Sequence, residues 1–250
     1  AGQIVTNAQD VLVQAGGALS NSGGFITAQN HLRLTAADMS NSGTLYAGGS
    51  QNINISQTLT SSGVLAAAGD INLRAGIFSG SQGHMVAAGM GSDGLLGGTG
   101  ALTMRTEGML QSAGQLRATG GVSLSGTGLD LSGTLIGGNT SSAVGSTRGD
   151  ISLTATSGDI LTRQAQVSTP GLLSITANSL GAQTLDNAGG LLSGGQLLIQ
   201  VGQLSNSQGS IQQTATGVQT ARMVATGNIS NSAGQIVTNA QDVLVQAGGA

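Results

Sequence analysis

Three consecutive stretches decide the fold: GGFITAQNHLRLTAADMSNS at 23–42, GTLYAGGSQNINISQTLTSS at 43–62 and GVLAAAGDINLRAGIFSGSQ at 63–82. Each opens with glycine, contains three short apolar segments and ends in small polar residues. A repeat of roughly 20 residues is one supersecondary unit, which cannot bury its apolar face alone and must stack on its neighbours. The chain is therefore predicted to be a stack of short, similar rungs.

The apolar residues of successive repeats line up in three columns. The first column is expected to contain Ile4, Phe25, Leu45, Leu65, Met85, Leu116, Val167, Leu191, Ile211 and Ile236. The second holds the alternating pairs Val11/Val13, Leu32/Leu34, Ile53/Ile55, Ile71/Leu73, Leu102/Met104, Val122/Leu124, Ile151/Leu153, Leu173/Ile175, Leu197/Ile199 and Val243/Val245. The third holds Leu19, Met39, Leu59, Phe78, Leu110, Leu131, Leu161, Leu185, Leu204 and Ile229.

Alternation with a period of two in the second column indicates strands with one buried face. The segments are too short, and glycine recurs too often, for helices. Three strands per repeat, separated by turn residues, make a three-sided coil in which each strand pairs with its neighbours about 4.8 Å away. The predicted fold is all-β, a right-handed parallel β-helix of about eleven rungs of roughly 20 residues.

A polar column follows the third apolar segment, with asparagines at Asn21, Asn41, Asn206 and Asn231. Asparagine tolerates the left-handed conformation of tight turns, and stacked amide side chains can hydrogen-bond along the axis. These residues are predicted to form a structural turn ladder. Residues 86–100 and 137–149 break the period and are predicted to be loop insertions, where function often resides.

Composition excludes several classes of protein. The chain has 250 residues, a net charge of −3, seven arginines, no lysine and no cysteine. Without a basic patch, nucleic-acid binding is not expected. The absence of cysteine rules out disulfides and thiolate metal sites. Only 7% of residues are charged, yet 38% are hydrophobic, which argues against disorder and for a narrow aliphatic core.

No catalytic, cofactor or metal site is predicted. A glycosidase needs two carboxylates at a defined separation, and Ca²⁺ needs several acidic ligands. The aspartates at Asp10, Asp70, Asp150 and Asp242 recur at one position before the second column and are interpreted as turn caps. His31 and His84, the only histidines, lie too far apart to share a metal. An enzyme acting on polysaccharides is the least favoured interpretation.

Arg148, Gly149 and Asp150 spell RGD, a tripeptide that integrins recognise. They are a candidate receptor contact if a loop displays them. The competing interpretation is structural, because Gly149 and Asp150 occupy recurring glycine and aspartate positions.

Residues 1–18 recur identically as residues 233–250. Ordinary rungs share a pattern but little identity, so the offset between positions 1 and 233 predicts a higher-order repeat of about 232 residues. Residues 1–250 are therefore expected to be one β-helix segment of a longer array. A duplication of artificial origin is the alternative.

The recurring combination of glycine, a short apolar pair, a strand such as AGDINL (68–73) or RGDISL (148–153), and turns such as ALSNSGG (18–24) and DMSNSGTL (38–45) resembles the filamentous haemagglutinin repeat. The resemblance covers nearly the whole chain. It implies a large exoprotein of two-partner secretion, either an adhesin or an effector of contact-dependent growth inhibition. The implied location is extracellular, at the outer membrane of a Gram-negative bacterium, with an outer-membrane transporter as secretion partner.

Two functions of different kinds follow from the resemblance. The first is a structural stalk that projects a distal adhesive or toxin-delivery region toward target cells, with the receptor contact made outside this chain. The second is a rod that itself binds surface receptors or glycans. Unpaired strand edges at the ends of the stack also predict end-to-end self-association of the isolated segment.

Overall fold

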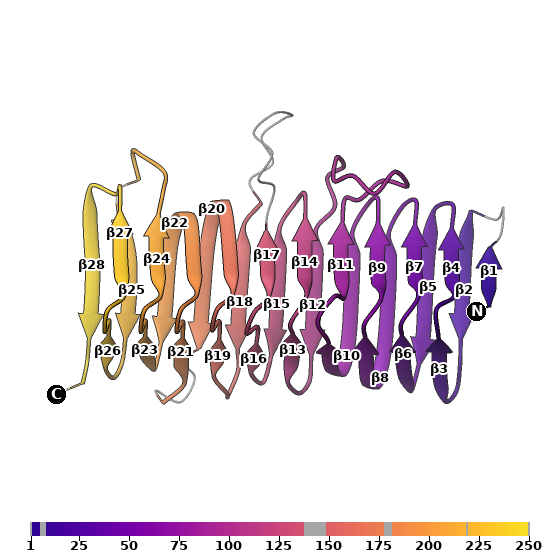
Figure 1. Ribbon diagram of the computed structural model, residues 1–250, viewed down its shortest axis with the longest axis horizontal. Coiled ribbons are helices and arrows are strands. Elements are labelled where there is room, and N and C mark those ends of the chain that lie inside the picture. The colour runs from indigo at the N-terminus through magenta and orange to yellow at the C-terminus, as the bar shows by residue number, and fades with distance from the viewer. Residues whose placement is uncertain (1, 6–8, 138–148, 178–181, 219, 250) are drawn as a thin grey trace.

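The computed structural model describes residues 2–5, 9–137, 149–177, 182–218 and 220–249. Within these residues every regular element is a β-strand, and every pairing between strands is parallel. The strands stack into one elongated solenoid, with the two ends of the chain at opposite ends of the long axis (Figure 1). The prediction of an all-β parallel solenoid is confirmed.

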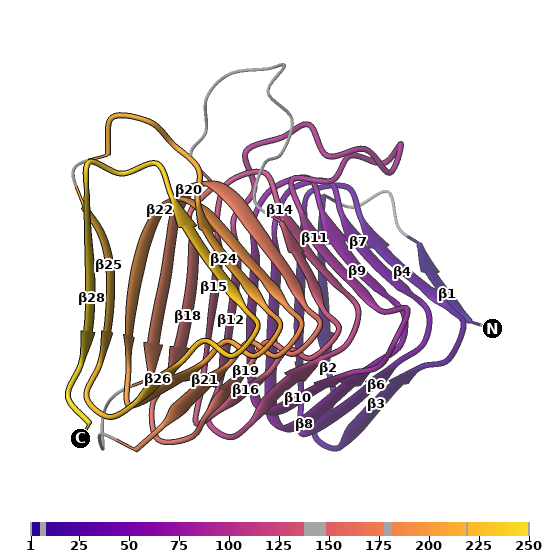
Figure 2. The same cartoon turned by 60° about the vertical axis from the view of Figure 1, so that its left-hand side comes forward.

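Three columns of strands run along the axis, and Figure 2 shows them on separate sides of the coil. The first column contains β1 (Gln3–Val5), β4 (Phe25–Ala28), β7 (Thr44–Ala47), β9 (Val64–Ala67), β11 (Met85–Ala88), β14 (Gln115–Ala118), β17 (Leu135–Gly137), the first parts of β20 (Gln166–Ala177) and β22 (Leu191–Val201), β24 (Ser210–Gln213) and β27 (Gln235–Thr238).

The second column contains β2 (Asp10–Gln14), β5 (His31–Ala36), the first parts of β8 (Gln51–Ser61) and β10 (Ile71–Gly80), β12 (Leu102–Thr106), β15 (Val122–Gly126), β18 (Ile151–Ala155), the second parts of β20 and β22, β25 (Thr220–Ala225) and β28 (Asp242–Ala247). The third contains β3 (Ala18–Asn21), β6 (Asp38–Asn41), the second parts of β8 and β10, β13 (Leu110–Ser112), β16 (Leu129–Asp130), β19 (Ile160–Leu161), β21 (Thr184–Asp186), β23 (Gln203–Ser205) and β26 (Ile229–Ser230).

The solenoid has about ten turns, which agrees closely with the eleven rungs expected. In the second column the chain passes from β2 to β28 in ten register steps, through β5, β8, β10, β12, β15, β18, β20, β22 and β25. The average rung is longer than expected because several turns carry extra residues between strands.

The inward side chains of the first column differ from the prediction at three places. Ile26, Val86 and Leu192 are buried, whereas Phe25 is 47% exposed and Met85 and Leu191 lie outside the main core. Each error is a shift of one residue within an adjacent apolar pair. A one-residue shift reverses the face of a strand, and two neighbouring apolar residues leave the choice of face open in the sequence.

The other two columns contain errors of register. In the third column Leu129 and Ile160 hold the paired inward positions expected for Leu131 and Leu161, although Leu131 is buried as well. In the second column Gln51 and Ile53 pair with Leu32 and Leu34, so Ile55 stands one inward position farther along than expected. The sequence prediction also missed two strands, namely β17, whose inward residue is the buried Ile136, and β25, in which Ala221 and Met223 are buried. A buried glutamine and an alanine are weak signals in a search for aliphatic pairs.

The excursions from the solenoid begin later than predicted. Residues 86–88 belong to β11, so the first excursion starts at Gly89, which has a positive φ of 79°. Residue 137 likewise ends β17, and residues 138–148 of the second excursion lie outside the described part of the chain. Among the described residues, no helix is long and apolar enough to cross a membrane.

Close stacking requires glycine at the start of several rungs, whereas His84, Thr134 and Ala165 hold the equivalent position in three others. A Cβ atom at Gly43 would clash with the carbonyl oxygen of Gly24, and one at Gly63 would clash with that of Gly43. At Gly43 and Gly63 the backbone of the preceding rung therefore occupies the space that a Cβ atom would need.

Candidate functional surfaces

Buried amides line the corner that follows the third column. The side-chain Nδ2 of Asn21 donates to Oδ1 of Asn41 over 2.8 Å. At the other end of the rod, Asn187 donates to Asn206 over 2.8 Å, and Asn206 donates to Asn231 over 2.7 Å. The amide of Asn206 thus accepts from one rung and donates to the next, so the hydrogen bonds run along the axis. Asn187 was not recognised in the sequence because no serine follows it.

The amide ladder is interrupted in the middle of the rod, where Gly80 stands between Ser61 and Ser112. The imidazole of His84, which is fully buried, occupies the space next to Gly80. Its Nδ1 lies 2.6 Å from the carbonyl oxygen of Ser81, and its Nε2 lies 3.3 Å from Oγ of Ser112. Burial lowers the pKa of His84, although the hydrogen bond to Ser81 opposes that shift.

The recurring aspartates bind backbone amides of the following rung. Oδ1 of Asp10 accepts from the N–H of His31 over 3.2 Å, and Oδ1 of Asp70 accepts from Ala101 over 2.8 Å. These carboxylates accept from backbone N–H groups at the start of the second column, and the N–H of His31 also donates to the carbonyl oxygen of Gln9. Each is engaged with the protein's own backbone.

Two residues of the RGD tripeptide are placed by the structure. Asp150 is exposed, but its Oδ1 accepts a 2.8 Å hydrogen bond from the N–H of Leu172, and Gly149 is buried. Arg148 lies outside the described residues. The structure therefore assigns Asp150 the same backbone contact that Asp10 and Asp70 make.

The first excursion folds back over the outer surface of the first column. Met90 forms an isolated antiparallel bridge with Leu96, and both pack around the outward-facing Ala66 and Ala87. Tyr46 packs against the same cluster. Burial raises the pKa of the Tyr46 hydroxyl, and the negative charge of Asp93 raises it further, while a hydrogen bond with Ser92 opposes both.

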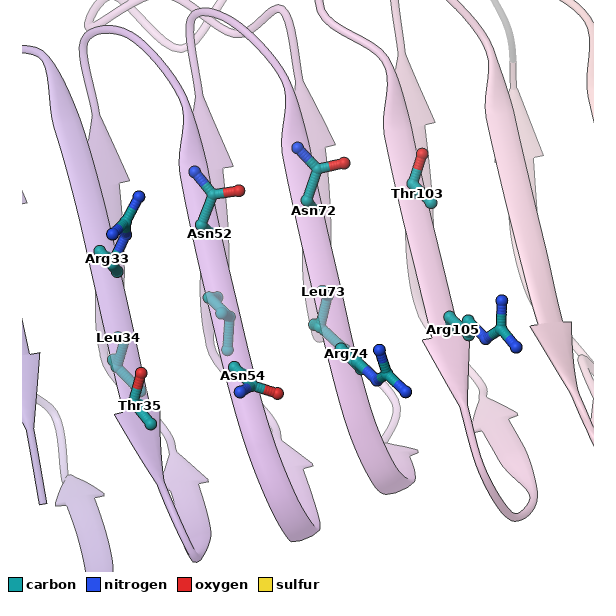
Figure 3. A pocket seen from close by; sticks show the side chains of 11 residues that line it. Arg33, Leu34, Thr35, Asn52, Asn54, Asn72, Leu73, Arg74, Thr103 and Arg105 are labelled. Carbon is teal, nitrogen blue, oxygen red and sulfur yellow. The ribbon is translucent and has the colours of Figure 1, made fainter. Parts of the chain in front are cut away.

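The outward surface of the second column carries a depression of about 530 Å³, which we call the arginine–asparagine face (Figure 3). It lies across β5, β8, β10 and β12. Its outward side chains form two rows along the axis, which are Arg33, Asn52, Asn72 and Thr103, and Thr35, Asn54, Arg74 and Arg105. The outward direction of the three arginines could have been predicted from the alternation of the strands, because each arginine follows an inward-facing residue.

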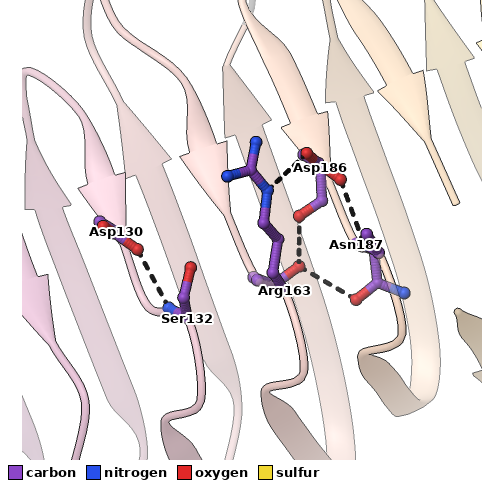
Figure 4. A network of polar contacts seen from close by, with 7 residues as sticks. Asp130, Ser132, Arg163, Asp186 and Asn187 are labelled. Carbon is purple, nitrogen blue, oxygen red and sulfur yellow. Dashed lines mark hydrogen bonds and ion pairs between the residues drawn. The ribbon is translucent and has the colours of Figure 1, made fainter. Parts of the chain in front are cut away.

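Two ion pairs form among the described residues, and only one of them has both side chains exposed. Arg74 lies 3.5 Å from Glu107, and both side chains are more than half exposed. On the third column Nε of Arg163 lies 2.7 Å from Oδ2 of Asp186 on the next rung, as Figure 4 shows. An exposed pair such as Arg74–Glu107 contributes about 0–1 kcal/mol, whereas the Asp186 side chain is mostly covered.

The described residues contain no group of three or more histidine, cysteine or acidic side chains that could hold a metal ion. His31 lies at the surface, with Nδ1 2.8 Å from Oγ of Ser50, whereas His84 is enclosed. The His84–Ser112 contact resembles half of a catalytic dyad, but both side chains are buried and neither contacts a carboxylate within hydrogen-bond distance among the described residues. Its geometry fits a packing role.

Comparison with known proteins gives one informative match. The chain is 36% identical over 124 residues to the toxin CdiA of Yersinia pestis. The match covers 50% of this chain and 4% of the length of that protein. No protein-family model and no solved structure matches the chain. The similarity to CdiA and the parallel β-solenoid together fit a filamentous haemagglutinin-like repeat region.

Proposed function

We propose that this chain is a segment of the stalk of a large, secreted, cell-surface exoprotein that projects a distal adhesive or toxin-delivery region toward target cells. The observation that carries the proposal is the second column, in which parallel pairing runs without a break from β2 to β28. Ten steps of about 4.8 Å make a rod about 48 Å long with one continuous core. A rod of this kind can hold a distal region at a distance from the cell surface.

The duplicated segment supports the same role. β2 and β28 share the sequence DVLVQ and stand in the same column ten steps apart. The offset between Asp10 and Asp242, about 232 residues, thus corresponds to a whole number of turns. Blocks of this length can follow one another without a change of register, and each adds about 48 Å of rod. We propose that the parent protein repeats the block.

The similarity to CdiA supports the setting proposed for the stalk. In this setting the exoprotein crosses the outer membrane of a Gram-negative bacterium through a two-partner-secretion transporter and stays attached to the cell surface. The receptor contact is made by a region outside this chain. No enzymatic role is proposed for the segment.

Excision of residues 1–232 from the full-length exoprotein tests the stalk. Because residues 233–250 repeat residues 1–18, the sequence at the junction stays unchanged, and the rod should shorten by about 48 Å in electron micrographs of cells. Secretion should persist, and inhibition or attachment should fall with rod length. Insertion of an unrelated solenoid block of equal length should restore it. Failure of that replacement, with normal secretion and length, would show that the block has a specific binding role.

The alternative in which the rod itself contacts a receptor rests on the exposure of Asp150. Asp150→Glu in the full-length protein should abolish integrin-dependent attachment if the tripeptide acts there. Unchanged attachment would remove this alternative. We also propose that the isolated segment associates end to end, because Val237, Val243 and Val245 of its last rung are about half exposed. Sedimentation at increasing concentration tests this.

A further inference from the structure

The arginine–asparagine face differs in charge from the rest of the molecule. The chain carries a net charge of −3. Yet the two outward rows that form the face, followed by register from β2 to β28, contain four arginines and no carboxylate, while Asp10, Asp70, Asp150 and Asp242 form a separate outward row at the starts of these strands. Three of these arginines, Arg33, Arg74 and Arg105, are gathered over β5, β10 and β12. The face thus gathers three guanidinium groups, beside a row of aspartates, on a rod that is acidic as a whole.

Among the described residues, only one of the three arginines is paired with a nearby acidic group. Glu107 lies at the edge of the face, 3.5 Å from Arg74. Asp10 and Asp70, near the starts of β2 and β10, direct Oδ1 to backbone N–H groups. Within the described residues Arg33 and Arg105 form no ion pair, and both side chains are exposed. A negatively charged ligand can reach these two guanidinium groups without displacing a partner.

The spacing of these groups fits an extended ligand aligned with the rod. Arg33 and Arg74 stand two rungs apart, about 10 Å along the axis, and Arg105 stands one rung farther, about 5 Å. Asn52, Asn54 and Asn72 lie between them, and each amide offers donors and an acceptor. Guanidinium groups bind carboxylates through paired hydrogen bonds, and amides suit hydroxyl groups.

We propose that the arginine–asparagine face binds an acidic polysaccharide, a glycan chain whose carboxylates meet the arginines and whose hydroxyls meet the asparagines. A single-stranded nucleic acid fits less well, because the two rows contain no aromatic side chain on which bases could stack. An anionic membrane fits less well too, because it is recognised by clusters of about four to eight basic residues. This binding role is separate from the stalk and does not depend on it.

The test measures binding of a fluorescent galacturonic-acid oligomer to the full chain by anisotropy. We expect saturable binding that weakens between about 50 and 200 mM salt, and no binding of a neutral glucan oligomer of equal length. The double variant Arg33→Gln/Arg105→Gln should bind at least about tenfold more weakly, since it loses two charge-assisted contacts. Circular dichroism should be unchanged, because both side chains are exposed.

The matched control is Arg163→Gln/Arg222→Gln, which removes the same charge outside the depression. Arg163 lies on another column, and Arg222 lies on β25 at the far end of the rod. This variant should bind the oligomer within about twofold of the unmodified chain. Equal losses in the two double variants would overturn the proposal, since binding would then follow net charge.

A second variant separates a glycan from polyanions in general. Asn52→Ala/Asn72→Ala should weaken binding of the galacturonic-acid oligomer about threefold to tenfold, because two amide–hydroxyl contacts are lost. An unchanged affinity would overturn the proposal, as would equal affinity for a single-stranded DNA of similar length and charge. No detectable binding of the oligomer at low salt would overturn it directly.

Discussion

His84 fills the position that Gly80 leaves empty in the buried amide ladder. A Cβ atom at Gly80 would clash with the imidazole ring, and Nε2 of that ring lies 3.3 Å from Oγ of Ser112 on the next rung. Phe78 packs edge-on against the same ring, with centroids 5.8 Å apart. A residue four positions away along the chain thus replaces the missing side chain and carries the polar contacts on to Ser112, beyond which the buried Leu131 occupies the same column.

The solenoid should lose stability in mild acid through His84. Burial lowers the folded-state pKa of His84 below its unfolded value of about 6.5, so the unfolded chain binds the proton more readily. The stabilising contribution is therefore complete above about pH 6.5, declines as the pH falls through that value and levels off below the folded-state pKa. Urea midpoints measured between pH 8 and pH 5 should fall more for the unmodified chain than for His84→Asn. His31→Asn is the control, because His31 is exposed. Identical pH profiles for the unmodified chain and His84→Asn would contradict this assignment.

Asn206→Ala should destabilise the C-terminal part of the rod by about 2 kcal/mol. The substitution leaves Oδ1 of Asn231 without its donor and removes the acceptor for Asn187, both at the corner after the third column. Ser205→Ala, one residue earlier on β23 and facing outward, should change stability by less than about 0.5 kcal/mol. Hydrogen exchange of the rungs on either side provides the measurement, because losses should spread mainly to nearest neighbours. Equal effects of the two substitutions would mean that the ladder contributes no stability.

Leu153→Asp should prevent stable folding of the central rungs, whereas Ser152→Asp should be tolerated. Leu153 is fully buried between Leu124 and Ile175 of adjacent rungs, and Ser152 points to the opposite face of β18. An unpaired carboxylate in the narrow core costs several kcal/mol. Thermal melting followed by circular dichroism should therefore separate the two variants by more than about 10 °C. Similar melting curves would reverse the inward assignment of this strand.

Ionisation of Tyr46 should report whether the excursion after β11 is docked. Tyr46 is the only tyrosine and the chain has no tryptophan, so absorbance near the tyrosinate band follows this one group. Its pKa should lie above the ordinary value of about 10, because burial and the charge of Asp93 both disfavour the phenolate. Asp93→Asn should lower the pKa, while Asp70→Asn, a carboxylate of the second column, should leave it unchanged. A titration of Tyr46 that ignores Asp93 would show that the excursion is not packed there in solution.

Much of this architecture could be predicted from the sequence. The spacing of glycine, aliphatic pairs and polar corners indicated stacked strands in three columns, because short amphipathic strands bury their apolar faces only by stacking. The pattern could not show whether Phe25 or Ile26, or whether Leu191 or Leu192, points into the core. Both members of each pair are apolar, so the sequence does not tell which one faces inward. Gln51 escaped recognition because a buried glutamine becomes acceptable only through its 2.6 Å hydrogen bond to the carbonyl of Ala66.

The sequence by itself determined that this chain is a stack of β-rungs, that its corners are polar and tightly turned, and that its first 18 positions recur at its end. These properties depend on local periodicity and on residue identity. Only the tertiary structure decided that the recurring unit spans ten turns, that His84 completes the ladder beside Gly80, and that Arg33, Arg74 and Arg105 share one face. Each of these depends on the register between successive rungs, and turns of unequal length shift that register without leaving a periodic trace in the sequence.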